Sequence, residues 1–135
     1  MKYLYSILFV LVLFTGCGKD DSYIPDVAVN YNITVTEFSL KATNNVLLVP
    51  DHGVAGLIIV KTSLGGYLAF DRCSSVNPEA RCKVVPDDSG LSATDPCSGA
   101  KFSLIDGGPV KAPAVRNLKA YTVYLQGGQL LNVRN

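Results

Sequence analysis

Turn-forming residues recur so often along this chain that no long secondary-structure element fits between them. The apolar run Val46–Val49 lies between an Asn pair and a Pro-Asp pair, and the run at residues 57–60 lies between Gly56 and the Gly-rich stretch 64–66. Short runs rich in Val, Ile, Thr and Tyr favour β-strands, and Gly, Pro, Asn and Asp favour the turns between them. No window longer than one turn has convincing helical periodicity. The pattern predicts an all-β sandwich or barrel.

Several further segments fit the same interpretation. Residues 32–40 alternate apolar and polar side chains in their first half, which predicts a strand. The remaining strands are expected after the turn at residues 64–66, on both sides of the Pro-Asp-Asp-Ser-Gly tip at residues 86–90, at residues 102–105, and on both sides of the Gln-Gly-Gly turn at residues 126–128.

The N-terminus has the pattern of a targeting signal. Lys2 is followed by an apolar run of twelve positions, residues 3–14, which only Ser6 interrupts. This run is too short to cross a bilayer as a helix and has the length of a signal-peptide core. It ends in Phe-Thr-Gly-Cys, which resembles a bacterial lipobox whose cysteine is acylated. We therefore expect residues 1–16 to be a lipoprotein signal peptide and Cys17 to carry lipid; the alternative is a plain secretory signal with a chance cysteine.

Three charged residues shortly after Cys17 resemble a second targeting signal. Lys19, Asp20 and Asp21 resemble the Lys-acidic-acidic tag with which one large phylum of Gram-negative bacteria sends lipoproteins to the outer face of the outer membrane. A solvated tether would also be polar, so that reading stays open. We expect an outer-membrane, lipid-anchored protein at the cell surface, with a tether at residues 17–30 and one β domain at residues 31–135.

Charge and histidine content exclude several function classes. The 12 basic and 11 acidic side chains are mixed along the chain, so no basic stripe supports nucleic-acid binding. The single histidine, His52, lies in a Pro-Asp-His-Gly turn and is expected to be a solvated turn residue. One histidine cannot supply a His-rich metal site, and no Ser or Cys is tied to it by sequence. We expect no enzymatic activity.

Residues 66–123 resemble the Rieske iron–sulfur family. That family holds a [2Fe–2S] cluster between a Cys-x-His loop and a Cys-x-x-His-Gly loop. The resemblance rests on Tyr-Leu-Ala-Phe-Asp-Arg-Cys before the first loop, on Ser-Gly-Ala-Lys-Phe-Ser-Leu-Ile-Asp-Gly-Gly after the second, and on the spacing of Pro113, Ala114, Leu118 and Tyr121. It implies an antiparallel β sandwich or barrel with the two loops side by side at one end. The core it implies contains Phe70, Phe102, Leu104, Leu118 and Tyr121.

The ligands of that family are mostly replaced in this sequence. Cys73 stands at the first Cys position, Ser75 at the first His, Asp95 at the second Cys and Ser98 at the second His. Serine is a poor ligand for soft iron, and aspartate offers a hard oxygen where the cluster takes a thiolate. The resemblance therefore implies four former ligand positions, and we expect neither a metal nor a cofactor.

The remaining cysteines leave alternatives. Some Rieske proteins join their two loops by a disulfide, and the resemblance implies that Cys82 and Cys97 form it; a Cys73–Cys97 pair is the second possibility. A pair that closes a loop of about 15 residues stabilises the fold by about 3 kcal/mol in the chain-entropy model. If no disulfide forms, three thiols and the Asp95 carboxylate make an alternative ligand set.

Together these features predict a surface lipoprotein whose Rieske-like domain has lost its cluster and serves as a binding or structural module. Its partners would be the membrane, through the lipid, and a protein or small molecule that the sequence does not name. The alternative function is electron transfer by a retained [2Fe–2S] cluster. An enzyme that uses Cys73, Asp95 and Ser98 would have no general base within the motif.

Overall fold

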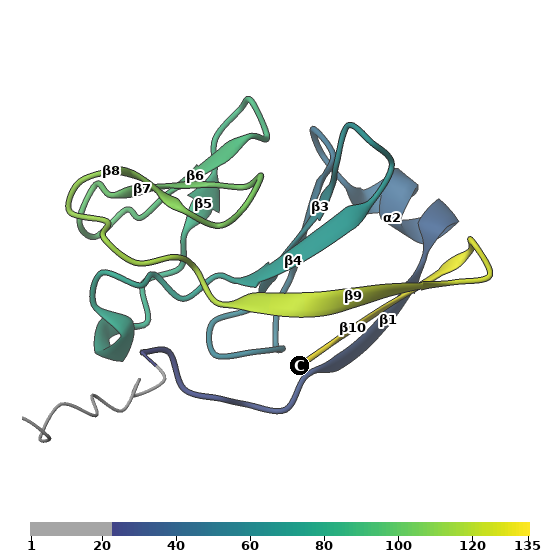
Figure 1. The fold of residues 1–135 in the computed structure, drawn as a ribbon, viewed down its shortest axis with the longest axis horizontal. Helices are drawn as coiled ribbons and strands as arrows, with labels where there is room; N and C mark the ends of the chain where they lie inside the picture. Colours follow the sequence, from purple (N-terminus) through teal and green to yellow (C-terminus); the bar gives the residue numbers. More distant parts are fainter. Residues whose placement is uncertain (1–22) are drawn as a thin grey trace, which may run out of the picture.

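The computed structural model describes residues 23–135, which form two antiparallel sheets (Figure 1). The expected signal peptide, the lipid site Cys17 and the tag Lys19, Asp20 and Asp21 lie outside the described residues. In spatial order, the large sheet contains β1 (Asn30–Thr34), β10 (Leu130–Arg134), β9 (Ala120–Gln126), β4 (Tyr67–Asp71), β3 (Leu57–Lys61) and β2 (Val46–Val49). The small sheet contains β5 (Val85–Pro86), β6 (Ser92–Thr94), β7 (Lys101–Ser103) and β8 (Pro109–Lys111). The expectation of an antiparallel all-β domain is confirmed.

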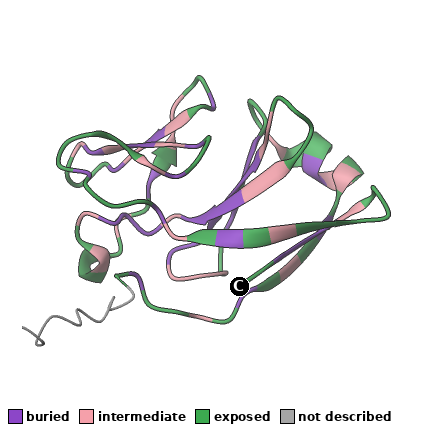
Figure 2. Ribbon diagram, viewed as in Figure 1, coloured by how far each residue is buried: buried purple, intermediate pink, exposed green. Residues whose placement is uncertain are grey.

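Strand β3, which lies between β2 and β4, shows why some strands of the large sheet have uninterrupted apolar sequences. Successive side chains of a strand point to opposite faces of the sheet. Leu57 and Ile59 enter one core cluster, whereas Ile58 and Val60 enter a second cluster that the small sheet covers. All four side chains are buried (Figure 2). Both faces of this strand are covered, so its sequence cannot alternate between apolar and polar residues.

The aromatic and aliphatic residues that the family resemblance places in the core are buried there. These residues are Phe70, Phe102, Leu104, Leu118 and Tyr121, and each is less than 7% exposed. The first four belong to the cluster between the two sheets, and Tyr121 belongs to the other cluster. Burying a side chain such as Phe102 stabilises the fold by about 1.5–3 kcal/mol, so this cluster fastens the small sheet to the large one.

The strand expected over residues 32–40 is correct only in its first half. Strand β1 ends at Thr34, and a helix, α2 (Val35–Lys41), follows. The Thr34 side chain accepts a hydrogen bond from the Glu37 backbone N–H at 3.1 Å, which caps the helix. Phe38 is buried, and Glu37 pairs with Lys41 one turn later. The Thr-x-x-Glu pattern of a capping box was present in the sequence, and the strand prediction overlooked it. The other helical element is the short 3₁₀ turn η2 (Pro78–Ala80).

Residues 23–29, called the strap below, run along the domain before β1 begins (Figure 1). They belong to the stretch expected to be a polar tether, yet Ile24 and Val29 are both only 4% exposed. Their apolar side chains pack on the domain, so the β domain takes in the chain from Tyr23 onward. Within residues 23–135, no helix is both long and apolar enough to cross a membrane.

Candidate functional site

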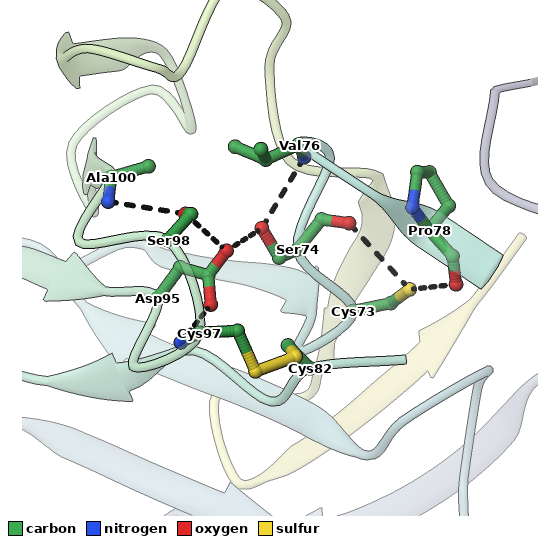
Figure 3. The surroundings of a disulfide bond; sticks show 9 residues. All are labelled: Cys73, Ser74, Val76, Pro78, Cys82, Asp95, Cys97, Ser98 and Ala100. Carbon is green, nitrogen blue, oxygen red and sulfur yellow. Dashed lines mark hydrogen bonds between the residues drawn. A yellow bond between two sulfur atoms is a disulfide. The ribbon is translucent and has the colours of Figure 1, made fainter. Parts of the chain in front are cut away.

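The two loops that correspond to the former ligand loops lie side by side (Figure 3), at the end of the domain away from the β9–β10 turn (Figure 1). The first loop leaves strand β4 and includes η2, and the second joins β6 to β7. Two links connect them: a disulfide between Cys82 and Cys97, and a hydrogen bond of 2.7 Å from the Ser74 hydroxyl to the Asp95 carboxylate. The expectation that both loops meet at one end is confirmed.

The disulfide is the pair that the family resemblance implied. The Cα atoms of Cys82 and Cys97 are 6.3 Å apart, and 15 residues separate them in sequence. Cys73 is free and buried, so the alternative Cys73–Cys97 pair does not form. The disulfide joins the end of the first loop to the turn between β6 and β7.

Asp95 occupies the position of the second-loop cysteine and is the hydrogen-bonding centre of the site. Its side chain is only 2% exposed. One carboxylate oxygen accepts from the hydroxyls of Ser74 at 2.7 Å and Ser98 at 2.6 Å, and the other accepts from the Cys97 backbone N–H at 2.8 Å. Burial raises the pKa of this carboxyl group, but these hydrogen bonds outweigh burial and lower the pKa below its usual value. Asp95 is therefore a buried carboxylate at neutral pH.

Cys73 stands at the first-loop cysteine position, but its side chain turns away from Asp95. It points toward Pro78 in Figure 3, and its Sγ lies 3.6 Å from the Pro78 carbonyl oxygen. Ile24 of the strap packs in the same small core cluster as Cys73. Burial, followed by the negative charge of Asp71, raises the pKa of this thiol to about 11. The thiol is therefore protonated and enclosed, and it resembles a small apolar core residue more than a metal ligand.

The two serines at the former histidine positions have structural partners of their own. The Ser75 hydroxyl is buried and donates to the Arg116 carbonyl oxygen at 2.7 Å. The Ser98 hydroxyl donates to Asp95 and accepts from the Ala100 backbone N–H at 3.2 Å. Both hydroxyls therefore hold the loops in shape.

These donors do not fit a Rieske cluster. Such a cluster takes two thiolates on one iron and two imidazoles on the other. Within residues 23–135, one group of three Cys, His, Asp or Glu side chains brings its ligand atoms within 4.8 Å of one another, and it consists of Cys82, Asp95 and Cys97. Both of its sulfur atoms are already joined in the disulfide. The Cys73 thiol, which would have been the fourth ligand of the alternative set, is not in this group.

Sequence reasoning missed a second buried carboxylate, Asp71, at the end of β4. Its side chain is fully buried and accepts from the backbone N–H groups of Val54, Ala55 and Cys73 and from the Tyr121 hydroxyl, at 2.6–3.1 Å. Burial, followed by this hydrogen bond and the negative charge of Asp71, raises the pKa of Tyr121. No motif distinguishes such an aspartate from one in a turn. Asp71 fixes the start of the first loop against two other parts of the chain.

Among residues 23–135, the contacts of His52 do not suggest catalysis. Its ring is half-buried, its Nδ1 lies 3.2 Å from the Pro50 carbonyl oxygen, and its edge meets the Tyr31 ring with the ring centres 5.0 Å apart. The residue therefore packs beside β1, where we expected a solvated turn side chain.

Comparison with solved structures supports the fold. No family model matches the chain, and no curated protein matches it. Among solved structures, the cyanobacterial plasma membrane Rieske protein PetC3 from Synechocystis PCC 6803 is similar, with a TM-score of 0.58 and 23% identity over 79% of this chain and 98% of that one. The ferredoxin of carbazole 1,9a-dioxygenase from Nocardioides aromaticivorans IC177 is similar with a TM-score of 0.54 and 18% identity, over 82% of this chain and all of that one. The described part of this chain therefore has a Rieske-like fold.

Proposed function

We propose that this protein is a lipid-anchored, cell-surface protein whose Rieske-like domain holds no [2Fe–2S] cluster and acts as a binding or structural module. The observation that carries the proposal is Asp95. At the position where the family presents a thiolate, this chain has a buried carboxylate whose oxygens accept hydrogen bonds from both loops.

The loss of the cluster removes a cross-link between the loops, and other bonds of this domain take over that task. In a Rieske domain the two irons join the loops because each loop contributes a cysteine and a histidine. Here the Cys82–Cys97 disulfide and the Ser74–Asp95 hydrogen bond join the same two loops. A module held in this way keeps its shape without metal, and its loop end is free for a non-redox role.

Electron transfer is the second candidate function. It is favoured by the names of the similar structures, which are a Rieske protein and a ferredoxin. Those likenesses concern the fold, whereas the four former ligand positions of this chain retain only the Cys73 thiol. The ligand chemistry therefore favours the cluster-free module.

The decisive test measures the metal content of the mature protein. The full chain would be produced in a bacterium that processes lipoproteins and purified from its membranes, alongside a Rieske ferredoxin produced in the same host as a control for cluster loading. We expect colourless protein with less than about one-tenth of an iron or acid-labile sulfide per chain, because a His₂Cys₂ ligand set is missing. Near-stoichiometric iron and sulfide with visible absorption would reject the cluster-free proposal and favour electron transfer.

The anchor is tested separately. We expect Cys17→Ala to move the protein from the detergent phase to the aqueous phase on detergent partitioning, because the variant lacks the thiol that would carry the membrane-binding acyl chain. Replacing Lys19, Asp20 and Asp21 together with alanine should keep the lipid but abolish digestion by protease added to intact cells. A Cys17→Ala protein that stayed in the membrane would refute lipidation, and unchanged digestion would refute the tag.

A further inference from the structure

The strap is fastened to the loop end of the domain by its first residues. The Tyr23 hydroxyl donates to the Val76 carbonyl oxygen at 3.3 Å, and the Arg116 guanidinium lies over the Tyr23 ring, 3.9 Å from its centre. Ile24 is buried in the cluster that contains Cys73 and Ala55. Tyr23 and Ile24 therefore contact both the first loop and the segment that leads into β9.

The rest of the strap is fastened as well, so it follows one path to β1. The Lys119 ammonium pairs with Asp26 and donates to the Pro25 carbonyl oxygen. The Asn135 side chain donates to the Val27 carbonyl oxygen and accepts from the Val29 backbone N–H, both at 3.0 Å. The strap is therefore held against the domain from Tyr23, beside the former ligand loops, to Val29.

The distance from Cys17 to this point is short. The six peptide steps between Cys17 and Tyr23 span at most about 20 Å when fully extended. Strand β9 leads from the loop end to the β9–β10 turn, and its seven residues cover about 23 Å. A lipid at Cys17 thus keeps Tyr23, beside the former ligand loops, within about 20 Å of the lipid-bearing residue. The β9–β10 turn lies farther from that residue by about the length of β9.

We propose that the former ligand loops face the lipid leaflet that carries the anchor, and that the β9–β10 turn faces away from it. The inference rests on the proposed lipid at Cys17 and adds an orientation to it. In this arrangement the strap sets which end of the domain meets the membrane.

The exposed side chains of the loop end suit a surface of phospholipid headgroups. Arg81, Lys83 and Arg116 are exposed there, and Glu79 is the exposed acidic residue of the same loop. Val115, next to Arg116, is 78% exposed. Basic side chains near a bilayer are attracted to anionic headgroups, so this end favours contact with the leaflet.

Headgroup quenching tests the orientation. A fluorophore would be attached to Val115→Cys at the loop end or to Gln126→Cys at the far end of β9, both of which are exposed positions. The lipidated full-length protein would be placed in vesicles of phosphatidylethanolamine and phosphatidylglycerol that contain a lipid with a quenching nitroxide on its headgroup. Because the two probes differ in height by about the length of β9, we expect at least about twofold stronger quenching at position 115.

A strap variant gives the experiment its control. Replacing Tyr23 and Ile24 together with serine should release the strap and bring quenching at the two positions closer together. Ala28→Ser changes an exposed residue of the strap and should leave the difference intact. Equal quenching at both positions, stronger quenching at position 126, or a difference that survives release of the strap would overturn the orientation while leaving the anchor standing. Failure of the unlabelled protein to float with the vesicles would overturn the anchor, and the orientation with it.

Discussion

Ser74 and Ser98 donate to the same oxygen of Asp95. Replacing each serine in turn with alanine compares what a buried and an exposed hydrogen bond to this carboxylate contribute to stability. The Ser74 bond is 2.7 Å long and joins the two loops, whereas the Ser98 bond is 2.6 Å long and stays within one loop. Ser74 is fully buried and Ser98 is exposed. Both substitutions remove one hydroxyl and leave the carboxylate in place, so each is the matched control of the other.

The expected magnitudes follow from this difference in burial. A hydrogen bond to a charged group contributes about 1.5–3 kcal/mol to stability when water cannot replace it. Each serine also accepts one backbone N–H, Ser74 from Val76 at 3.3 Å and Ser98 from Ala100 at 3.2 Å, so both variants lose such an acceptor. We expect Ser74→Ala to lower the free energy of unfolding by about 2 kcal/mol. Water can reach Asp95 from the exposed side in Ser98→Ala, so that loss should be about 0.5–1 kcal/mol.

Urea unfolding of the oxidised protein measures both losses. With a denaturant slope of roughly 1.5 kcal/mol per M, a loss of 2 kcal/mol lowers the urea midpoint by about 1.3 M. The slope itself should not change, because neither substitution alters the buried surface much. Equal losses for the two variants, or a loss below about 0.5 kcal/mol for Ser74→Ala, would refute the view that Asp95 links the loops.

The pH dependence of the same pair provides a second measurement. The folded-state pKa of Asp95 is lowered, so its contribution to stability is fully present above the unfolded-state pKa of about 3.9 and is lost as the pH falls through the lower folded-state value. A protonated carboxyl group makes a weaker hydrogen bond with Ser74. We therefore expect the loss in Ser74→Ala to shrink from about 2 kcal/mol at neutral pH toward about 1 kcal/mol as the carboxyl group becomes protonated in acid, below about pH 3.9. A loss that grows on acidification would contradict the charged state assigned to Asp95.

Three further predictions concern the loops and their support. Replacing both cysteines of the disulfide with alanine should lower the free energy of unfolding by about 3 kcal/mol in urea titrations; a change under about 1 kcal/mol would show that the other contacts suffice. Cys73 should resist alkylation by iodoacetamide at pH 8 and react fully in denaturant, because burial raises its thiol pKa to about 11; mass spectrometry would detect any native reaction. Gly107→Ala should destabilise by about 2–4 kcal/mol, because φ is +78° and the added Cβ would lie 2.8 Å from the Phe70 ring. Gly65→Ala is the control, because its φ is also positive, +86°, but nothing lies within 4 Å of the added Cβ, so it measures backbone strain without a clash. An equal loss of stability in Gly65→Ala would argue against a clash at Gly107.

Residues with regular spacing made the fold predictable. Apolar runs such as Val46–Val49 matched their strand bounds, because a run between two strong turn signals has little freedom in register. Phe102 and Leu104 were expected in the core, and both are buried in the same cluster. The disulfide between Cys82 and Cys97 came from the family resemblance, since sequence spacing alone does not fix which cysteines pair.

The features that were missed depend on contacts between distant parts of the chain. Asp71 accepts from residues 16 and 17 positions earlier and from Tyr121, 50 positions later. Ser74 matters because it meets Asp95, 21 positions away. A strap that docks through Ile24 looks like any other short polar linker in sequence. The helix α2 was different, because its capping pattern was local and could have been found.

The small sheet and its loops form one long insertion between β4 and β9 of the large sheet. These two strands are neighbours in the large sheet, with Ala69 opposite Tyr121. The Asp71 backbone N–H donates to the Lys119 carbonyl oxygen at the point where the insertion begins and ends. None of the strands of the insertion pairs with a strand of the large sheet. Substitution at a tip residue such as Asp95 therefore leaves the ladder of the large sheet unchanged. Deleting the insertion would uncover Ile58 and Phe70, which pack beneath it, so the large sheet depends on the inserted segment to cover one of its faces.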